Sequence, residues 1–386
     1  MDNEDLKSLI IKKIKESIPK LKSNNHSRIS LFDFSKILYK PISDFFVFYN
    51  PVYKNKELEY FNEEENTDFL IFENNKVFID YSDNLFTFHK VDEEEKILEI
   101  DLDNQEIKDK SNNNKSDDDL AEMEIDSKTD LITLSYFPLS ISHCNITLCY
   151  EQDLPQVLSN ELLIQFLNIF NMVKNDSLIC GYDSLGGGCI INHLHFEFLF
   201  LDDFGENIKN LPIQNLDTSF LFETKLKHKN VEEISLFDGT TSIKVFVFNK
   251  VLKGYKITCE LGQEKTNEIS SMENLYQNSI SHIVNIFLND FINKEIAHNL
   301  IISKKGTEIY LIPRKFEDNK HKYNSCWNDL AGLITIKEEK DYENINENDV
   351  KKFFEDEINL EESKFKEITD AIVEKIDSVY EITKNN

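Results

Sequence analysis

Three of the chain's ten glycines stand together at 186–188, within the stretch GYDSLGGGCIINHLHFEF at 181–198. The residues that follow these glycines alternate polar and apolar side chains, as a strand with one buried face does. On such a strand the polar face carries His193, His195 and Glu197, and the apolar side chains between them point into a core. The stretch therefore predicts a glycine turn that leads into a strand presenting two imidazoles and a carboxylate together.

The glycine run indicates what these histidines could act on. Glycine permits positive φ angles and close approach of the backbone, so peptide N–H groups can surround an anion. The stretch lacks the Gly-Lys-Ser/Thr ending of a P-loop. We therefore expect Gly186, Gly187 and Gly188 to form a phosphate-sized cradle beside the two histidines.

The His-x-His pair is also compatible with a structural role or with metal binding. Histidines on a strand often serve only packing or the surface, and two at this spacing could instead bind zinc. Glu197 could complete a zinc site, although no third His or Cys ligand stands at motif spacing. We expect neither a metal nor a cofactor.

The charge balance limits the partners of the chain. Its 386 residues include 43 Lys and Arg against 71 Asp and Glu, which gives a formal net charge of -28. Such a surface opposes attraction to phosphate backbones and anionic lipid, so nucleic acid and membranes are disfavoured as partners. The six cysteines form no CxxC pair, as expected of reduced thiols in a cytosolic protein.

The most apolar segments favour a soluble cytoplasmic protein. Residues 1–28 place their apolar residues at helical spacing, which predicts an amphipathic helix rather than a secretory signal. The apolar stretch at 161–173 is far shorter than the roughly 20 residues that a membrane span needs.

Strand-like and helix-like patterns occur in the same order twice along the chain. Residues 29–205 contain the first set, with an insert at about 101–127 that has no aromatic residue and is expected to be disordered. Residues 206–386 contain a weaker version of the same set and end in helices. The pattern predicts an α+β fold of two lobes, each with an antiparallel sheet flanked by helices.

The stretch at 181–198 resembles the signature of the GDP-hexose phosphorylases, which belong to the histidine-triad superfamily and act on GDP-D-glucose in animals and GDP-L-galactose in plants. That signature is close to Gly-Tyr/Phe-Asn-Ser-Leu/Val-Gly-Gly/Ala followed, a few residues later, by Asn-His-Leu-His. The segments FPLSISHCNIT, TEIYLIPRKFE and CWNDLAGLITIKEEKDYENINENDV are similar to other parts of the family. The resemblance runs from about residue 130 to the C-terminus and implies histidine-triad-like lobes.

The resemblance implies that inorganic phosphate cleaves a GDP-hexose into GDP and hexose 1-phosphate, without a cofactor. His195 would attack the α-phosphorus to form a guanylyl-histidine, which phosphate would then attack. His193 would orient the nucleophile, and Ser184 would hold phosphate oxygens together with the glycine turn. GDP-D-glucose is favoured over GDP-L-galactose because Gly186 and Gly187 are nearer the animal form of the signature.

Three residues near the predicted site have open roles. Glu197 stands where the family has Gln or His, so it would repel a phosphoryl group unless it is protonated, turned away or neutralised. Asp183 replaces the family's Asn and adds a second acid near the same phosphates. His143 follows Ser142 where the family has Gly, and we expect His143 to be structural.

Two residues outside the signature also carry expectations. Trp327, the only tryptophan, is expected in the core or at the lobe interface, and Arg314 at a solvated strand end. The Lys/Arg-rich N-terminal segment of the plant members is absent from LKSNNHSRISLFDF. The sequence thus identifies no residue that recognises guanine.

Two further functions fit the same signature. One is a catalytically inactive nucleotide-binding protein that keeps the fold. The other is a different nucleotidyl transferase or hydrolase of the superfamily, which would share His195 and transfer the nucleotide to another acceptor. Dependence on phosphate separates the phosphorylase from this last class, and a guanylyl-His195 adduct excludes the inactive protein.

Overall fold

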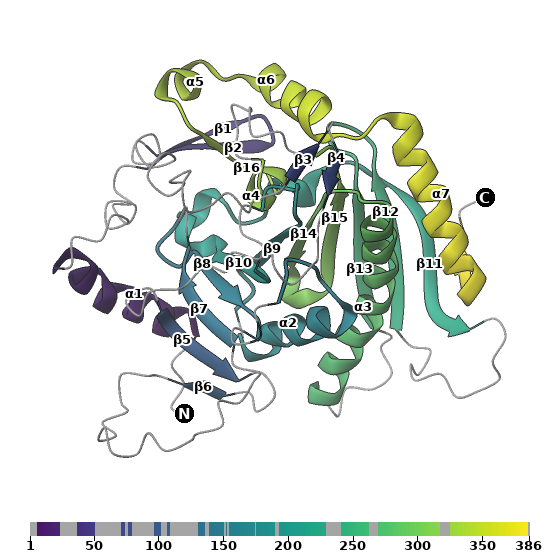
Figure 1. The fold of residues 1–386 in the computed structure, drawn as a ribbon, viewed down its shortest axis with the longest axis horizontal. Helices are drawn as coiled ribbons and strands as arrows, with labels where there is room; N and C mark the ends of the chain where they lie inside the picture. Colours follow the sequence, from purple (N-terminus) through teal and green to yellow (C-terminus); the bar gives the residue numbers. More distant parts are fainter. Residues whose placement is uncertain are drawn as a thin grey trace.

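The fold is given by a computed structural model (Figure 1). It describes residues 6–23, 37–50, 71–73, 76–78, 96–101, 106–108, 130–135, 139–149, 152, 154–173, 175–189, 193–228, 241–261, 269–316 and 325–384.

Seven α-helices are found among these residues. They are α1 (Leu6–Ser23), α2 (Asn160–Met172), α3 (Ile269–Asn293), α4 (Trp327–Leu330), α5 (Glu339–Asn344), α6 (Glu347–Lys352) and α7 (Glu362–Val379). The first of them lies within the predicted N-terminal helix at 1–28 and buries Leu9, Ile10 and Ile14. None of these seven combines the length and the apolar character that crossing a membrane requires.

The centre of the molecule is one antiparallel sheet that has 12 strands in the described segments (Figure 1). Its order is β17-β11-β12-β13-β15-β14-β9-β10-β8-β7-β5-β6. The strands are β5 (Lys96–Asp101), β6 (Glu106–Lys108), β7 (Asp130–Leu134), β8 (Cys144–Thr147), β9 (Leu178–Asp183), β10 (His195–Phe200), β11 (Thr218–His228), β12 (Thr241–Phe248), β13 (Tyr255–Leu261), β14 (His298–Ser303), β15 (Glu308–Pro313) and β17 (Tyr380–Thr383).

Two halves of this sheet repeat the same topology. Outward from the junction between β9 and β14, the orders are β9-β10-β8-β7-β5 and β14-β15-β13-β12-β11. A helix precedes the central strand in each half, since α2 lies between β8 and β9 and α3 between β13 and β14. The predicted α+β class with antiparallel sheets and flanking helices is confirmed, and the sheets of the two halves join edge to edge where Ile301 pairs with Gly181.

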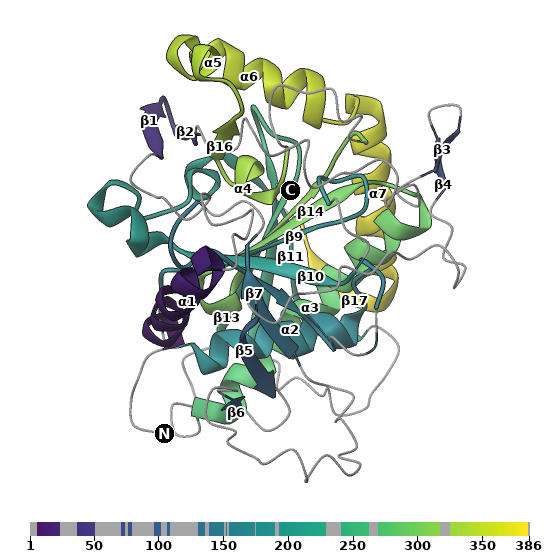
Figure 2. The same cartoon turned by 60° about the vertical axis from the view of Figure 1, so that its left-hand side comes forward.

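Different elements cover the two faces of the sheet. The helices α2, α3 and α7 pack on one face (Figure 2). The other face carries α4, α5 and α6 with a small sheet of β1 (Leu38–Ile42), β2 (Phe45–Tyr49) and β16 (Leu333–Ile336). A separate hairpin is formed by β3 (Ile71–Glu73) and β4 (Lys76–Phe78).

The predicted insert lies largely outside the described residues, whereas the predicted lobe boundary lies within them. Of the insert at 101–127, the structure describes Asp101 at the end of β5 and the short strand β6, and the rest lies outside the described segments. The predicted lobe boundary after residue 205 falls in a 3₁₀ turn (Leu201–Asn207) between β10 and β11, and it stays a prediction.

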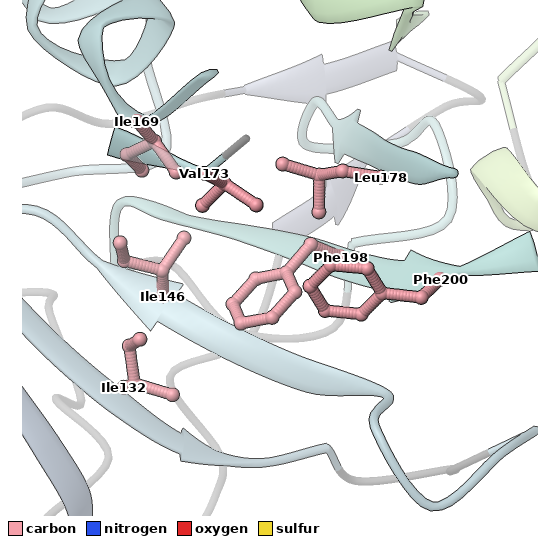
Figure 3. Close-up of a pocket in the computed structure, with 7 residues that line it drawn as sticks. All are labelled: Ile132, Ile146, Ile169, Val173, Leu178, Phe198 and Phe200. Atoms are coloured by element: carbon pink, nitrogen blue, oxygen red, sulfur yellow. The ribbon is translucent and has the colours of Figure 1, made fainter. Parts of the chain in front are cut away.

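A narrow apolar cavity of about 10 Å³ lies on the helix-covered face (Figure 3). Its lining consists of Ile132, Ile146, Ile169, Val173, Leu178, Phe198 and Phe200. This volume is close to the minimum of about 10–15 Å³ that holds one water molecule, and the lining offers no polar partner. The cavity is therefore a packing space in the core. The catalytic candidates on β10 face the opposite side of the sheet.

Candidate active site

The start of β10 holds the imidazole of His195 in a defined state. Nδ1 of His195 lies 2.7 Å from the carbonyl oxygen of His193, a buried residue just before the strand. A carbonyl oxygen only accepts hydrogen bonds, so Nδ1 carries the ring proton and donates it. In the neutral imidazole Nε2 is then the nitrogen with the lone pair, which is the state that nucleophilic attack requires.

The predicted alternation of side chains along this strand is confirmed. Leu194, Phe196 and Phe198 are buried on the helix-covered face, and Phe196 stacks on Phe166 of α2 with ring centroids 3.5 Å apart. His195 therefore belongs to the opposite face together with the next alternate residue. That residue is Glu197.

Glu197 is held by two hydrogen-bond donors. Its Oε2 accepts from Nε1 of Trp327 at 2.8 Å and lies 3.3 Å from Nε2 of His143. Nδ1 of His143 accepts the backbone N–H of Leu139 at 3.1 Å, so the ring proton of His143 lies on Nε2 and points to Glu197. Burial raises the pKa of Glu197, but the hydrogen bonds from His143 and Trp327, together with charge interactions with His143 and His195, bring the pKa below its ordinary value.

The contacts of Glu197 also bear on the zinc alternative. No group of three His, Cys, Asp or Glu side chains with the geometry of a metal site occurs in the described segments. His143 and Trp327 both donate hydrogen bonds to Oε2 of Glu197. The structure thus assigns His143 a contact within the site, where it supports the acid beside His195.

The pKa of Asp183, at the end of β9, is shifted in the opposite direction to that of Glu197. Its Oδ1 accepts from the backbone N–H of Trp327 at 2.8 Å and from the side-chain amide of Asn299. Burial, together with the charge of Glu197, raises the pKa of Asp183 well above its ordinary value, even though Asn299 and Arg314 oppose the shift. A protonated Asp183 is neutral, as the Asn of the family pattern is.

The glycine turn is packed against residues from the second half of the chain. Gly186 and Gly188 have φ angles of +74° and +106°, which L side chains rarely adopt. A Cβ atom on Gly186 would lie 1.8 Å from the ring of Phe316, and one on Gly188 would lie 2.9 Å from the carbonyl oxygen of Ser325. The turn therefore needs glycine for its conformation and for this close approach, whatever else it binds.

Ser184 joins the turn to β14. Its hydroxyl accepts the N–H of His298 at 2.8 Å and donates to the carbonyl oxygen of Leu185 at 3.3 Å. The N–H of Gly187 donates to the carbonyl oxygen of Ser184 at 2.8 Å. The bond from His298 ties the two halves together, and the other two lie within the turn. The role of Ser184 and the glycines in holding phosphate stays a prediction.

Arg314 corrects one expectation. Its side chain is 2% exposed, so the prediction of a solvated strand end is wrong. The guanidinium donates to the carbonyl oxygens of Ser325 and, at 3.3 Å, Gly187, and Nδ2 of Asn299 donates to the same Gly187 oxygen at 2.5 Å. Ser325 thus packs against Arg314 at the end of β15. The sequence pattern around Arg314 does not reveal this contact. Trp327 is fully buried, as predicted.

Comparison with known proteins places the chain in a family. A family model described as "GDPGP1-like, N-terminal domain" matches residues 57–199, and one described as "GDPGP1-like, C-terminal domain" matches residues 242–379. The chain belongs to the GDPGP1-like family. The two matches together span most of the chain, and the first includes the glycine turn, His195 and Glu197. The family resemblance drawn from the sequence is thereby confirmed.

The chain is also similar to two curated proteins of Arabidopsis thaliana. It is 22% identical to GDP-L-galactose phosphorylase 2 over 317 residues, which are 78% of this chain and 63% of that protein. It is 22% identical to GDP-L-galactose phosphorylase 1 over 263 residues, which are 64% of this chain and 50% of that protein. The chain thus spans between half and two thirds of the length of these relatives.

Among solved structures, the yeast Ap4A phosphorylase Apa2 has a similar fold. One of its structures aligns with a TM-score of 0.51 at 14% identity, over 93% of this chain and 97% of that one. Its complex with Ap4A aligns with a TM-score of 0.50 at 14% identity, over 89% of this chain and 95% of that one. These alignments show that this member of the GDPGP1-like family shares its overall fold with Apa2.

No role was predicted from the sequence for three residues that shape the site. Gln156, in the loop before α2, binds the backbone of His195, and Asn299 from β14 binds Asp183. Gly181 on β9 leaves space for Trp327. Asn299 is a polar amide within the apolar run HNLIIS, which weakly indicates a specific role for it. The role of Gln156 depends on contacts that form only in the folded chain.

Replacing Asp183 with Asn is expected to stabilise the protein increasingly as the pH rises. The folded state raises the pKa of Asp183, so it binds this proton more tightly than the unfolded chain does. The contribution of Asp183 to stability is therefore present below its unfolded pKa of about 4 and is lost as the pH rises through its folded pKa. The Asp183→Asn variant has no such loss. Its thermal midpoint should therefore rise relative to that of the unchanged chain as the pH increases through this window.

Thermal unfolding at a series of pH values checks this expectation. Asp217→Asn is a matched control, because the Asp217 side chain is 69% exposed. Its midpoint should differ from that of the unchanged chain by a nearly constant amount. A stability difference for Asp183→Asn that stays constant or shrinks with rising pH would contradict the raised pKa of Asp183.

Proposed function

We propose that this member of the GDPGP1-like family is a GDP-hexose phosphorylase that works through a guanylyl-His195 intermediate. The observation that carries the proposal is the 2.7 Å contact between Nδ1 of His195 and the carbonyl oxygen of His193. This contact leaves the lone pair of His195 on Nε2. Membership of the family and the named activity of the plant relatives support the choice of a GDP-hexose as substrate.

The reaction proceeds by two displacements at the same phosphorus atom. Nε2 of His195 attacks the α-phosphorus of the GDP-hexose, and the bond to the bridging oxygen breaks to release hexose 1-phosphate. An oxygen of inorganic phosphate then attacks the α-phosphorus, the bond to Nε2 breaks, and GDP leaves. The nucleophile thus divides one difficult substitution into two easier ones and returns to its starting state.

Glu197 has a favourable role in this scheme. The guanylylated ring of His195 bears phosphorus on Nε2 and a proton on Nδ1, so the ring is positively charged. Glu197 lies on the same face of β10, two residues along, and its lowered pKa keeps it ionised. Its negative charge stabilises the charged ring, while Trp327 and His143 hold the carboxylate and reduce its repulsion of phosphate oxygens.

The choice of hexose remains part of the proposal. The sequence favours GDP-D-glucose on the basis of Gly186 and Gly187, whereas the curated relatives are GDP-L-galactose phosphorylases. Cβ atoms on these glycines would meet Phe316 and the backbone of His298. The glycines therefore serve packing within the chain, and both sugars need to be assayed.

Release of GDP from GDP-D-glucose and GDP-L-galactose, with and without inorganic phosphate, tests the proposed function. We expect turnover that requires phosphate and yields hexose 1-phosphate in equal amount to GDP, with the faster sugar identifying the substrate. Equal nucleotide release without phosphate would indicate a hydrolase or another transferase of the superfamily. No turnover of either sugar by the folded chain would favour the inactive nucleotide-binding protein.

A further inference from the structure

The strands β9 and β10 separate at the level of the nucleophile. Their pairing runs from Leu178 with Phe200 to Gly181 with Glu197. Continuing the same register would bring Asp183 opposite His195. Asp183 instead pairs with Asn299 of β14 on its other side, and the chain leaves β9 to enter the glycine turn. His195 thus begins β10 without β9 as its backbone partner at this level.

The side chain of Gln156 fills this gap between the strands. Its Oε1 accepts the N–H of His195 at 2.9 Å, and its Nε2 donates to the carbonyl oxygens of His195 at 3.1 Å and Asp183 at 2.9 Å. The side chain is 2% exposed. Its amide therefore makes the bonds that a neighbouring strand would make, both to the N–H and to the C=O of the nucleophile.

The backbone beside Gln156 fixes the group that orients the imidazole. The carbonyl oxygen of Leu154 accepts the N–H of Leu194 at 2.7 Å. This N–H belongs to the same peptide unit as the His193 carbonyl, and in a trans peptide the two groups point to opposite sides. Binding of the N–H by Leu154 therefore directs the His193 oxygen away from Leu154, where it receives the Nδ1 proton of His195.

A further contact anchors this segment to β9. The hydroxyl of Tyr182 donates to the carbonyl oxygen of Gln156 at 2.8 Å, and Tyr182 is itself buried. Residues 154–156, which we call the 154–156 brace, are thus bonded to both of the separated strands. The brace holds the backbone of His195 through Gln156 and the orienting carbonyl of His193 through Leu154.

We propose that Gln156 is the positioning residue of the nucleophile His195, a role that rests on the proposed function. Gln156 acts through the backbone of His195 and keeps Nε2 aligned with the α-phosphorus in the guanylylation step. Loss of this alignment should lower kcat more than it weakens substrate binding, because Gln156 bonds the backbone of His195. A misplacement of about 1 Å of a catalytic group lowers rates by on the order of 100-fold.

The test compares Gln156→Met with a matched variant. Gln165 on α2 is a half-buried glutamine whose amide donates to the carboxylate of Asp130 at 3.1 and 3.2 Å, so Gln165→Met removes a similar group elsewhere in the same half. We expect Gln156→Met to lower kcat for phosphorolysis by about 10- to 100-fold with KM for the GDP-hexose within about twofold. Gln165→Met should keep kcat within about twofold at a comparable loss of thermal midpoint.

A second variant covers the case in which Gln156→Met does not fold. Gln156→Glu keeps the size of the side chain and the acceptor for the His195 N–H, and loses the two donated bonds. The same selective loss of kcat is expected. A kcat for the Gln156 variants equal to that of Gln165→Met, or a change confined to KM, would overturn the proposal.

A spectroscopic readout separates this proposal from the proposed function. If the unchanged chain shows no phosphorolysis, the proposed function fails, and the nitrogen NMR signals of histidine-labelled protein then decide the role of Gln156. The His195 signals, identified by their loss in His195→Asn, should show the Nδ1–H tautomer in the unchanged chain and an averaged tautomer in Gln156→Met. Identical His195 signals in both proteins would overturn the positioning role.

Discussion

Replacing His195 with Asn is expected to lower kcat for phosphorolysis by about 10⁴-fold or more. The Asn side chain is polar and smaller than imidazole, so β10 should keep its pairing with β8. It has no nitrogen lone pair that can form a bond to phosphorus, however, and neither displacement can occur. Binding of the GDP-hexose should persist, because the residues that hold the turn, such as Ser184 and Arg314, belong to other elements.

The measurement is steady-state release of GDP, with substrate binding followed separately by calorimetry. His282→Asn is a matched control, because His282 is a half-buried histidine on α3, on the helix-covered side of the sheet. That variant should keep kcat within about threefold, because His282 lies on the side of the sheet opposite His195. Substantial turnover by His195→Asn would show that the reaction does not use this imidazole.

Replacing Gly181 with Ala is expected to destabilise the protein by about 3 kcal/mol or more. A Cβ atom at this position would lie 1.9 Å from Cδ2 of Trp327, whose ring is fully buried. The ring would have to move away from β9, and the bond from its Nε1 to Glu197 would break. Because Trp327 is the only tryptophan, its fluorescence reports directly on this displacement, and its emission should shift to longer wavelength as water gains access.

A double-mutant comparison isolates the contact between Gly181 and Trp327. Trp327→Leu destabilises the protein by itself, since it empties space in the core. In that background Gly181→Ala should cost far less than it costs in the unchanged chain, because the clashing ring is gone. Additive effects of the two substitutions on thermal unfolding would contradict the clash as the cause.

The sequence predicted those features of the fold that depend on local patterns. The alternation from His193 to Phe198 identified β10 and its two faces, because one strand buried on one side carries that information in its own residues. The repeated order of strands and helices predicted the α+β class, and the register of Ile301 with Gly181 is the long-range pairing that a single local pattern does not contain.

The surroundings of His195 were predicted less well, because they depend on contacts between residues that lie far apart in the sequence. Glu197 was identified as an acid in an unfavourable place, but the two side chains that donate hydrogen bonds to it lie 54 and 130 positions away in the sequence. Arg314 looks solvated in its own segment and is buried because residues near Ser325 fold over it. Gln156 gives no motif at all, since its partners on β9 and β10 meet it only after the sheet has formed.

The proposed mechanism is tested most directly by isolating the covalent intermediate. The chain would be incubated with the GDP-hexose in the absence of phosphate, digested, and examined by mass spectrometry. The mechanism predicts a guanylyl group on His195, formed together with hexose 1-phosphate and removed by added phosphate with release of GDP. Turnover that depends on phosphate without any such adduct, or an adduct on a residue other than His195, would contradict it.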